Sequence, residues 1–142
     1  MGGGNFAGAN RSNRMRILII DDHAAFRQVV KMRLRAAGVD WVECEDGKNA
    51  VAQYPLVLPD LVLMDISMKE MDGLRATAQI KARDPGARIV ILTEYDDPDL
   101  RQAAEQAGAC DYLLKEDLSR LSELLRSLSF GTSTAMTSRS KS

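Results

Sequence analysis

Five side chains suited to phosphoryl chemistry each follow a short apolar run of the chain: Asp21, Asp22, Asp65, Thr93 and Lys115. Three carboxylates brought together repel one another, and near a dry sheet edge they are costly without a counter-charge. A hard divalent cation with oxygen ligands, Mg²⁺ (or Mn²⁺), would remove that cost, and the lysine would add a fixed positive charge. Grouped in space, these residues would suit transfer of a phosphoryl group to an aspartate, with the threonine hydroxyl as a hydrogen-bond donor.

The apolar runs before these residues have the character of strands buried on both faces, because they do not alternate with polar residues. Segments with apolar residues at helical spacing separate them. The predicted strands are 16–20, 39–45, 61–64, 88–92 and 110–114. The predicted helices cover about 26–37, 46–54, 72–83, 98–108 and 118–128, with Pro55 ending the second helix.

Strands that alternate with helices predict an α/β fold built on one parallel sheet. Right-handed crossovers with short loops favour the doubly wound order 2-1-3-4-5. In that order the first and third strands are neighbours, so their carboxyl ends bring the three aspartates together, with the threonine and lysine on one flank. We expect a disordered N-terminal segment over 1–15, a folded domain over 16–129 and a disordered Ser/Thr-rich tail over 130–142.

The composition excludes several classes of protein. With 142 residues, 19 basic and 20 acidic side chains, the net charge is −1, which gives no general electrostatic basis for binding nucleic acid or a membrane surface. No apolar run approaches the roughly 20 residues of a membrane helix. Cys44 and Cys110 cannot form a disulfide scaffold, which indicates a reducing, cytoplasmic setting. Both are predicted to be buried thiols on the two edge strands.

Several segments together resemble the receiver domain of two-component response regulators over roughly residues 15–129. The resemblance implies the flavodoxin-like (βα)5 fold of the CheY-like superfamily. The Asp-Asp-His start and the Tyr-Leu-Leu-Lys end are most similar to receivers that usually precede a LuxR- or FixJ-type helix-turn-helix domain. The segments are Ile20-Asp21-Asp22-His23, Leu63-Met64-Asp65-Ile66-Ser67-Met68, Met71-Asp72-Gly73, Ile91-Leu92-Thr93 and Ala107-Gly108-Ala109-Cys110-Asp111-Tyr112-Leu113-Leu114-Lys115.

The resemblance implies a role for each carboxylate. Asp65 would accept a phosphoryl group from the phosphohistidine of a sensor histidine kinase or phosphotransfer protein. Asp22, Asp65 and the backbone carbonyl of Ser67 would hold Mg²⁺, with Asp21 acting mainly through water.

The resemblance also implies a switch. Lys115 and Thr93 would contact the phosphoryl oxygens, and Tyr112 would follow Thr93 by turning inward. The surface of the fourth helix, fifth strand and fifth helix would then change and control a downstream protein or an output domain. The same surface is a candidate for forming a homodimer, which the sequence leaves open. Such a protein is no enzyme in the ordinary sense, since it catalyses only its own phosphorylation and dephosphorylation.

Two positions depart from the usual receiver pattern. Lys69 stands where a proline is common, so the loop after the third strand is expected to be less constrained. Glu94 stands where a small residue is usual. We expect Glu94 and Tyr95 either to alter the lifetime of the phosphoryl group or, as the simpler alternative, Glu94 to point into solvent.

Other charged residues have simpler interpretations. His23, at a helix start beside two acids, is expected to be a solvated cap residue and not a phosphocarrier. A basic helix face is expected to be solvated or, alternatively, to dock an acidic partner; it comprises Arg27, Lys31, Arg33 and Arg35.

Two other classes of function stay open at this point. One is a receiver-like module that binds proteins without being phosphorylated. The other is a hydrolase that forms an aspartyl-phosphate, but that family would want a second aspartate where Ser67 stands. A dinucleotide site is disfavoured because no glycine-rich phosphate loop follows the first strand.

Overall fold

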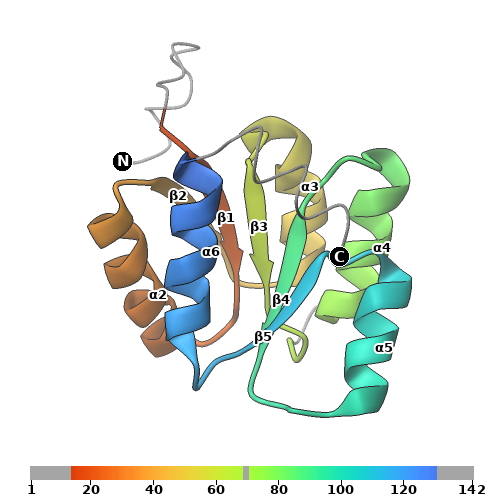
Figure 1. Ribbon diagram of the computed structural model, residues 1–142. Coiled ribbons are helices and arrows are strands. Elements are labelled where there is room, and N and C mark those ends of the chain that lie inside the picture. Colours follow the sequence, from red (N-terminus) through yellow and green to blue (C-terminus); the bar gives the residue numbers. More distant parts are fainter. Residues whose placement is uncertain (1–13, 69–70, 131–142) are drawn as a thin grey trace.

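Five short strands form one parallel sheet in the predicted order, β2-β1-β3-β4-β5. The computed structural model describes residues 14–68 and 71–130, without the side chains of 129 and 130. The strands are β1 (Arg16–Ile20), β2 (Asp40–Cys44), β3 (Leu61–Met64), β4 (Ile89–Thr93) and β5 (Asp111–Leu114). The helices are α2 (Ala24–Ala37), α3 (Gly47–Val57), α4 (Gly73–Arg83), α5 (Pro98–Ala107) and α6 (Leu118–Phe130). Strands and helices alternate along the chain (Figure 1).

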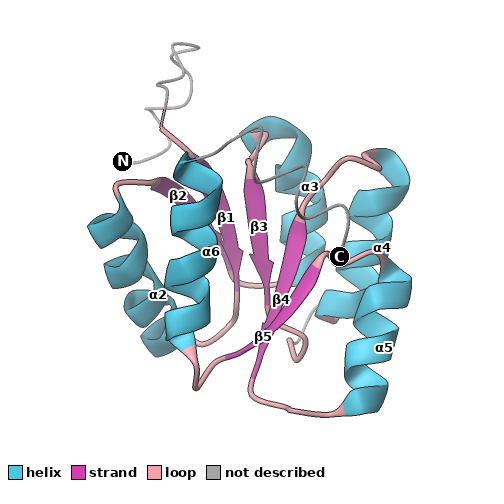
Figure 2. Cartoon of the chain, in the orientation of Figure 1, coloured by secondary structure: helices cyan, strands magenta, loops and turns pink. Residues whose placement is uncertain are grey.

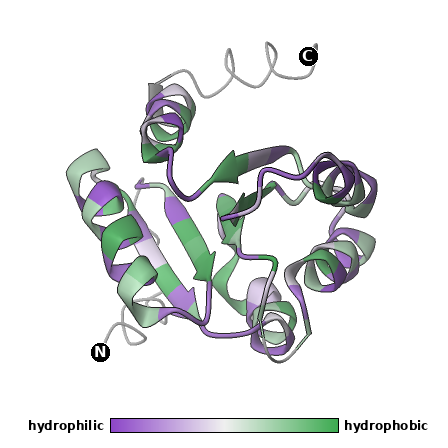
Figure 3. Cartoon of the chain, turned by 90° about the horizontal axis from the view of Figure 1, so that it is seen from below, coloured by the Kyte–Doolittle hydropathy of each residue, from purple (hydrophilic) through white to green (hydrophobic). Residues whose placement is uncertain are grey.

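Helices cover both faces of the sheet (Figure 2). On one face, Ile17 and Ile19 pack in a cluster with Leu34 of α2 and Leu121 of α6. On the other, Leu18 packs in a second cluster with side chains of α3, α4 and α5. Successive β1 side chains therefore enter opposite cores, which explains the uniformly apolar strand sequences. Figure 3 shows the same division, with strongly apolar strands between helices of mixed character.

Helix α3 runs past the proline that was predicted to end it. Pro55 lies in the last turn, and the helix continues to Val57. A proline this close to the end removes only one i→i−4 hydrogen bond, so the helix survives it. The C-cap residue after the helix is Leu58, whose φ of 51° is left-handed and whose N–H donates to Tyr54 O at 2.9 Å.

The two cysteines differ in exposure, and the prediction that both are buried was wrong for one of them. Cys44 ends edge strand β2 and is buried, and this burial raises the pKa of its thiol to about 11. Cys110 is exposed because β5 begins only at Asp111, which leaves Cys110 in the turn before the edge strand.

At both ends of the predicted folded domain, 16–129, the described residues continue slightly further. Arg14 pairs with Asp40 at 3.3 Å and Met15 packs against the α2–α6 cluster, although both were assigned to the N-terminal segment. Helix α6 extends to Phe130. The rest of both predicted tails, and Lys69, lie outside the described residues. In the described part of the chain, no helix is long and apolar enough to cross a membrane.

Candidate functional site

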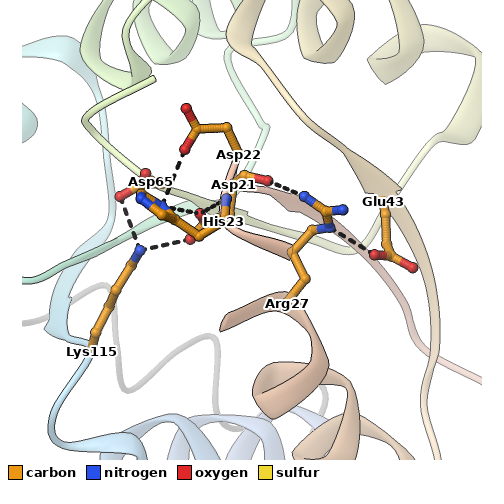
Figure 4. A network of polar contacts seen from close by, with 7 residues as sticks. All are labelled: Asp21, Asp22, His23, Arg27, Glu43, Asp65 and Lys115. Carbon is orange, nitrogen blue, oxygen red and sulfur yellow. Dashed lines mark hydrogen bonds and ion pairs between the residues drawn. The ribbon is translucent and has the colours of Figure 1, made fainter. Parts of the chain in front are cut away.

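Charged side chains from three strand ends meet at the carboxyl edge of the sheet (Figure 4). Asp21 and Asp22 follow β1, Asp65 follows β3 and Lys115 follows β5. Lys115 Nζ lies 2.7 Å from Asp21 Oδ2 and 3.4 Å from Asp65 Oδ1. The predicted convergence of the carboxylates is therefore found, and the lysine lies directly between two of them.

Asp65 is almost fully enclosed, with 5% of its side chain exposed. Its backbone N–H donates to Ile20 O at 2.9 Å, continuing the pairing of β3 with β1. Burial raises the pKa of Asp65 to about 6; the charge of Asp21 adds to the rise, and the Lys115 ammonium opposes it. The carboxyl group is therefore mainly ionised at neutral pH and held close to a single ammonium.

Lys115 is held from two sides. Its backbone N–H donates to Thr93 O at 2.7 Å, and its Nζ lies 4.4 Å from the centre of the Phe26 ring on α2. Burial opposes the charge of Lys115, yet the hydrogen bond to Asp21 and the charge of Asp65 outweigh it and raise the pKa above its ordinary value. A cation on an aromatic face gains attraction when both are shielded from water. Phe26 received no site role from the sequence.

Both carboxylate oxygens of Asp21 contact neighbouring groups of the protein. Its Oδ2 faces Lys115, while its Oδ1 accepts the His23 backbone N–H at 2.8 Å and lies 3.1 Å from His23 Nδ1. Both oxygens of Asp21 therefore have partners within the protein, and its indirect role toward Mg²⁺ stays a prediction.

Two carboxylate oxygens at the site are buried without a hydrogen bond, Asp65 Oδ2 and Asp22 Oδ1. The latter lies 3.1 Å from His23 Nδ1, outside hydrogen-bonding geometry. Buried polar atoms normally have partners, so such oxygens indicate a missing cation or donor. Hard oxygen ligands of this kind fit Mg²⁺. Ser67, whose carbonyl was predicted as a further ligand, is exposed on the wall of the same cavity.

The cavity above these carboxylates is open and measures about 690 Å³. Met68, Leu74 and Leu100 give it an apolar wall. Glu94 and Tyr95 also line it and are exposed, so Glu94 borders the route by which a phosphodonor or water would approach Asp65. Its effect on the phosphoryl lifetime stays a prediction.

Thr93 and Tyr112 are connected through one residue. Thr93 is 1% exposed, and its Oγ1 accepts the backbone N–H of Tyr95 at 3.2 Å. The Tyr112 hydroxyl donates to Tyr95 O at 2.6 Å, and Arg101 lies 4.5 Å from the centre of the Tyr112 ring. The ring of Tyr112 is already in the inward position that was predicted for the switched state. Thr93 and Tyr112 thus both hydrogen-bond to the backbone of Tyr95.

Two glycines allow the loop after β3 to return to the site. A Cβ at Gly73, the first residue of α4, would collide with the carbonyl oxygen of Asp65. A Cβ at Gly47 would collide with the carbonyl oxygen of Met71, whose own φ is 68°. The Met71-Asp72-Gly73 segment is one of those that resemble receiver domains. The close approach of the Asp65 carbonyl oxygen explains why a residue without a Cβ stands at position 73.

The basic face of α2 is largely paired within the protein. Arg27 contacts Glu43 at 2.8 Å and donates from Nη1 to Asp21 O at 2.6 Å, while Lys31 contacts Glu43 at 2.8 Å. These two side chains are only 13% and 15% exposed, so the prediction of a solvated face was wrong for them. Arg33 is exposed and donates to Ser122 Oγ.

His23 is exposed, as predicted, and is the N-cap residue of α2. However, its side chain makes no capping hydrogen bond. The imidazole turns instead toward the two aspartates that precede it, which the sequence did not indicate.

Comparisons with known proteins agree on one family. The family model described as the response regulator receiver domain matches residues 17–126. Chemotaxis protein CheY of Bacillus subtilis is 44% identical over 101 residues, covering 70% of this chain and 84% of that protein. Transcriptional regulatory protein DegU of Brevibacillus brevis is 37% identical over 123 residues, covering 84% of this chain and 52% of that protein. The chain thus spans about half the length of DegU.

Solved structures show the same similarity. The receiver domain of the putative response regulator NarL from Mycobacterium tuberculosis has a TM-score of 0.71 and 29% identity, covering 81% of this chain and 98% of that one. A LuxR-family response regulator from Aurantimonas has a TM-score of 0.71 and 29% identity, covering 80% and 86% of the two chains. The predicted similarity to LuxR-type receivers is therefore seen beside the similarity to CheY.

Proposed function

Because the chain belongs to the response regulator receiver domain family, we propose that it is a phosphorylatable switch with Asp65 as the phosphoacceptor. The donor would be the phosphohistidine of a sensor histidine kinase or phosphotransfer protein in the cytoplasm. A downstream protein or an output domain would read the result. One observation carries this proposal: a buried aspartate has an oxygen without a partner at the floor of an open cavity.

The chemistry follows from the side chains around Asp65. Its carboxylate attacks phosphorus, the P–N bond of the phosphohistidine breaks, and the electron pair of that bond returns to the imidazole of the donor. The product is an acyl phosphate on Asp65. Lys115 already lies 3.4 Å from Asp65 Oδ1, so its ammonium is placed to compensate the charge that the phosphoryl oxygens bring.

Asp22, Asp65 and the Ser67 carbonyl would hold Mg²⁺, since the two carboxylates supply the oxygens that lack hydrogen bonds. When bound, Mg²⁺ would neutralise the negative charges of the carboxylates and of the entering phosphoryl group. Asp21, which contacts Lys115 and His23, would keep these two side chains oriented toward the site.

The output would pass from Thr93 to the surface of α5, β5 and α6. If the Thr93 hydroxyl turned toward a phosphoryl oxygen, the Tyr95 N–H would lose its acceptor. The Tyr95 carbonyl, which accepts from the Tyr112 hydroxyl, would then move, and Tyr112 and the stacked Arg101 would move with it. This is a two-state element biased by a new charge, and the surface that changes is where a partner or a second copy would bind.

Intact mass spectrometry tests the proposal. The full chain is incubated with Mg²⁺ and acetyl phosphate, beside Asp65→Asn and the exposed control Asp60→Asn at the opposite edge of the sheet. We expect one added phosphoryl group in the wild type and in Asp60→Asn, and none in Asp65→Asn or without Mg²⁺. Equal phosphorylation of Asp65→Asn would contradict the assignment.

A second donor separates the remaining alternatives. If acetyl phosphate gives no product, phosphorylated histidine kinase is supplied, because Glu94 borders the approach to Asp65. Failure with both donors would favour a module that binds proteins without phosphorylation. Steady release of phosphate over many turnovers would favour a hydrolase.

A further inference from the structure

The only histidine of the sequence, His23, lies at the edge of the acidic site. Its backbone N–H donates to Asp21 Oδ1 at 2.8 Å, which fixes the start of α2 against the carboxylate. Its Nδ1 lies 3.1 Å from Asp21 Oδ1 and 3.1 Å from Asp22 Oδ1. Figure 4 shows the imidazole beside these two aspartates and Asp65, and His23 is one of the residues that line the cavity.

The positions of four potential ligand atoms allow them to share one ion. One atom each from Asp21, Asp22, His23 and Asp65 lies within 4.8 Å of the others. Ligand atoms of one tetrahedral zinc ion lie about 3.4 Å apart, so the widest separation in this set needs to close by about 1.5 Å at most. Independently of this grouping, Asp65 Oδ2 is buried, lacks a hydrogen bond and belongs to a side chain that is 5% exposed.

The nitrogen changes which ions such a site prefers. Mg²⁺ takes oxygen ligands almost exclusively, whereas imidazole nitrogen is a good ligand for Zn²⁺, Ni²⁺ and Co²⁺. Asp21 Oδ2 already faces Lys115 and Asp21 Oδ1 accepts the backbone N–H of His23, so Asp22, Asp65 and the imidazole are the groups left to coordinate an ion.

We propose that His23 Nδ1 is a ligand of a divalent transition-metal ion, bound together with the Asp22 and Asp65 carboxylates. The site then accepts two classes of ion: Mg²⁺ through oxygen alone, and zinc-like ions through oxygen and nitrogen. Both compete for the same carboxylates. The inference rests on the proposed function in one respect, because it uses the carboxylates assigned there to Mg²⁺.

Nitrogen NMR of the full chain tests the proposal directly, since a single histidine gives a single pair of ring signals. Zn²⁺ and Mg²⁺ are added separately at neutral pH, without a phosphodonor. We expect Zn²⁺ to shift the Nδ1 signal while Nε2 keeps its hydrogen, and Mg²⁺ to leave both ring signals nearly unchanged. A shift confined to Nε2, or no shift with Zn²⁺, would overturn the proposal.

Calorimetric titrations then measure selectivity. We expect His23→Phe, which keeps an aromatic ring without nitrogen, to weaken Zn²⁺ binding by about tenfold or more and Mg²⁺ binding by less than about twofold. Asp22→Asn should weaken both ions. Cys110→Ser should leave Zn²⁺ affinity unchanged, which excludes the exposed thiol as the zinc site. Equal losses of both ions in His23→Phe would show an electrostatic role only and overturn the ligand assignment.

These measurements remain informative if the proposed function fails. If the wild type is not phosphorylated but Zn²⁺ still shifts His23 Nδ1, the receiver chemistry fails and the metal site stands. If phosphorylation requires Asp65 and Mg²⁺ but the imidazole ignores Zn²⁺, only the present inference fails. Thermal unfolding of His23→Phe serves as the folding control, because the side chain is 59% exposed.

Discussion

The two ends of the sheet carry ion pairs of very different character. At the amino end, Arg14 and Asp40 lie 3.3 Å apart with 53% and 43% of their side chains exposed. At the carboxyl end, Lys115 and Asp21 lie 2.7 Å apart with 8% and 5% exposed, and Asp65 competes for the same ammonium. The first pair has one cation and one anion, both exposed to water. In the second, two buried carboxylates share one ammonium, which leaves an excess of negative charge.

This difference separates stability from function. An exposed ion pair contributes little to the free energy of folding. Buried carboxylates in excess are unfavourable in the protein alone, and they are relieved only when a cation arrives. The surplus of buried carboxylates at this end of the sheet therefore indicates where a ligand binds.

Removing the cation of the ion pair at each end of the sheet gives the largest expected contrast in stability. Lys115→Met leaves buried carboxylates without their ammonium, and we expect a loss of about 3–5 kcal/mol in the free energy of unfolding without Mg²⁺. Arg14→Met, the control at the other end, should lose less than about 1 kcal/mol. Urea unfolding measures both. Similar losses for the two variants would show that burial does not distinguish the two pairs.

Magnesium should stabilise the carboxyl end specifically. At a concentration one hundred times its Kd, Mg²⁺ is expected to raise the free energy of unfolding by about 2.7 kcal/mol, because it binds the folded protein alone. Asp22→Asn, titrated with the same Mg²⁺ concentrations, should show a much smaller rise. Thermal unfolding with and without EDTA checks this, and an equal rise in both proteins would place the ion elsewhere.

The approach of α4 to the site can be tested with one methyl group. Gly73→Ala places a Cβ against the Asp65 carbonyl, so we expect a loss of about 1–3 kcal/mol and weaker Mg²⁺ binding. In Gly86→Ala the nearest atom to the new Cβ is 3.5 Å away, an ordinary contact, so this control should be close to neutral. The two variants are compared by urea unfolding and calorimetry. Unchanged Mg²⁺ affinity in Gly73→Ala would show that the position of the loop before α4 does not affect metal binding.

The smallest expected effect concerns Glu43, which joins the end of β2 to α2. Burial favours a higher pKa, but the hydrogen bonds and charges of Lys31 and Arg27 prevail and lower it below 4.5. Because the pKa of Glu43 is lower in the folded than in the unfolded protein, its ionised carboxylate stabilises the fold at pH values above the unfolded-state pKa. This contribution is lost as the pH falls through the folded-state pKa. We therefore expect Glu43→Gln to flatten the stability profile below about pH 4.5 by less than about 1 kcal/mol. Glu45→Gln, which removes a neighbouring exposed carboxylate, should keep the wild-type profile in the same acid titration.

The sheet and the gathering of the aspartates could be predicted because strand order alone decides which strand ends are neighbours. Apolar runs that each end at a polar residue are enough to place Asp21 and Asp65 side by side. The extent of α3 could not be predicted in the same way, since whether Pro55 ends a helix depends on how near the last turn it lies.

Contacts between side chains needed the three-dimensional structure. Phe26 has the spacing of an ordinary core residue, and only the three-dimensional structure shows that its ring lies 4.4 Å from Lys115 Nζ. The inward turn of His23 depends on a backbone hydrogen bond to Asp21 that no sequence pattern encodes. Likewise, the contacts of Arg27 and Lys31 with Glu43 depend on the pairing of β2 with β1, because this pairing places the end of β2 near α2.

The unequal exposure of the two thiols makes this chain ready for fluorescence work without any substitution. The thiolate is the form that reacts with maleimides, and burial raises the pKa of Cys44 to about 11, so a dye at neutral pH attaches to Cys110. Cys110 lines a small cavity with Arg101 and Tyr112, on the face expected to respond to Asp65. A dye on Cys110 therefore lies beside Arg101 and Tyr112, which are expected to move on phosphorylation, and its emission can follow switching in real time.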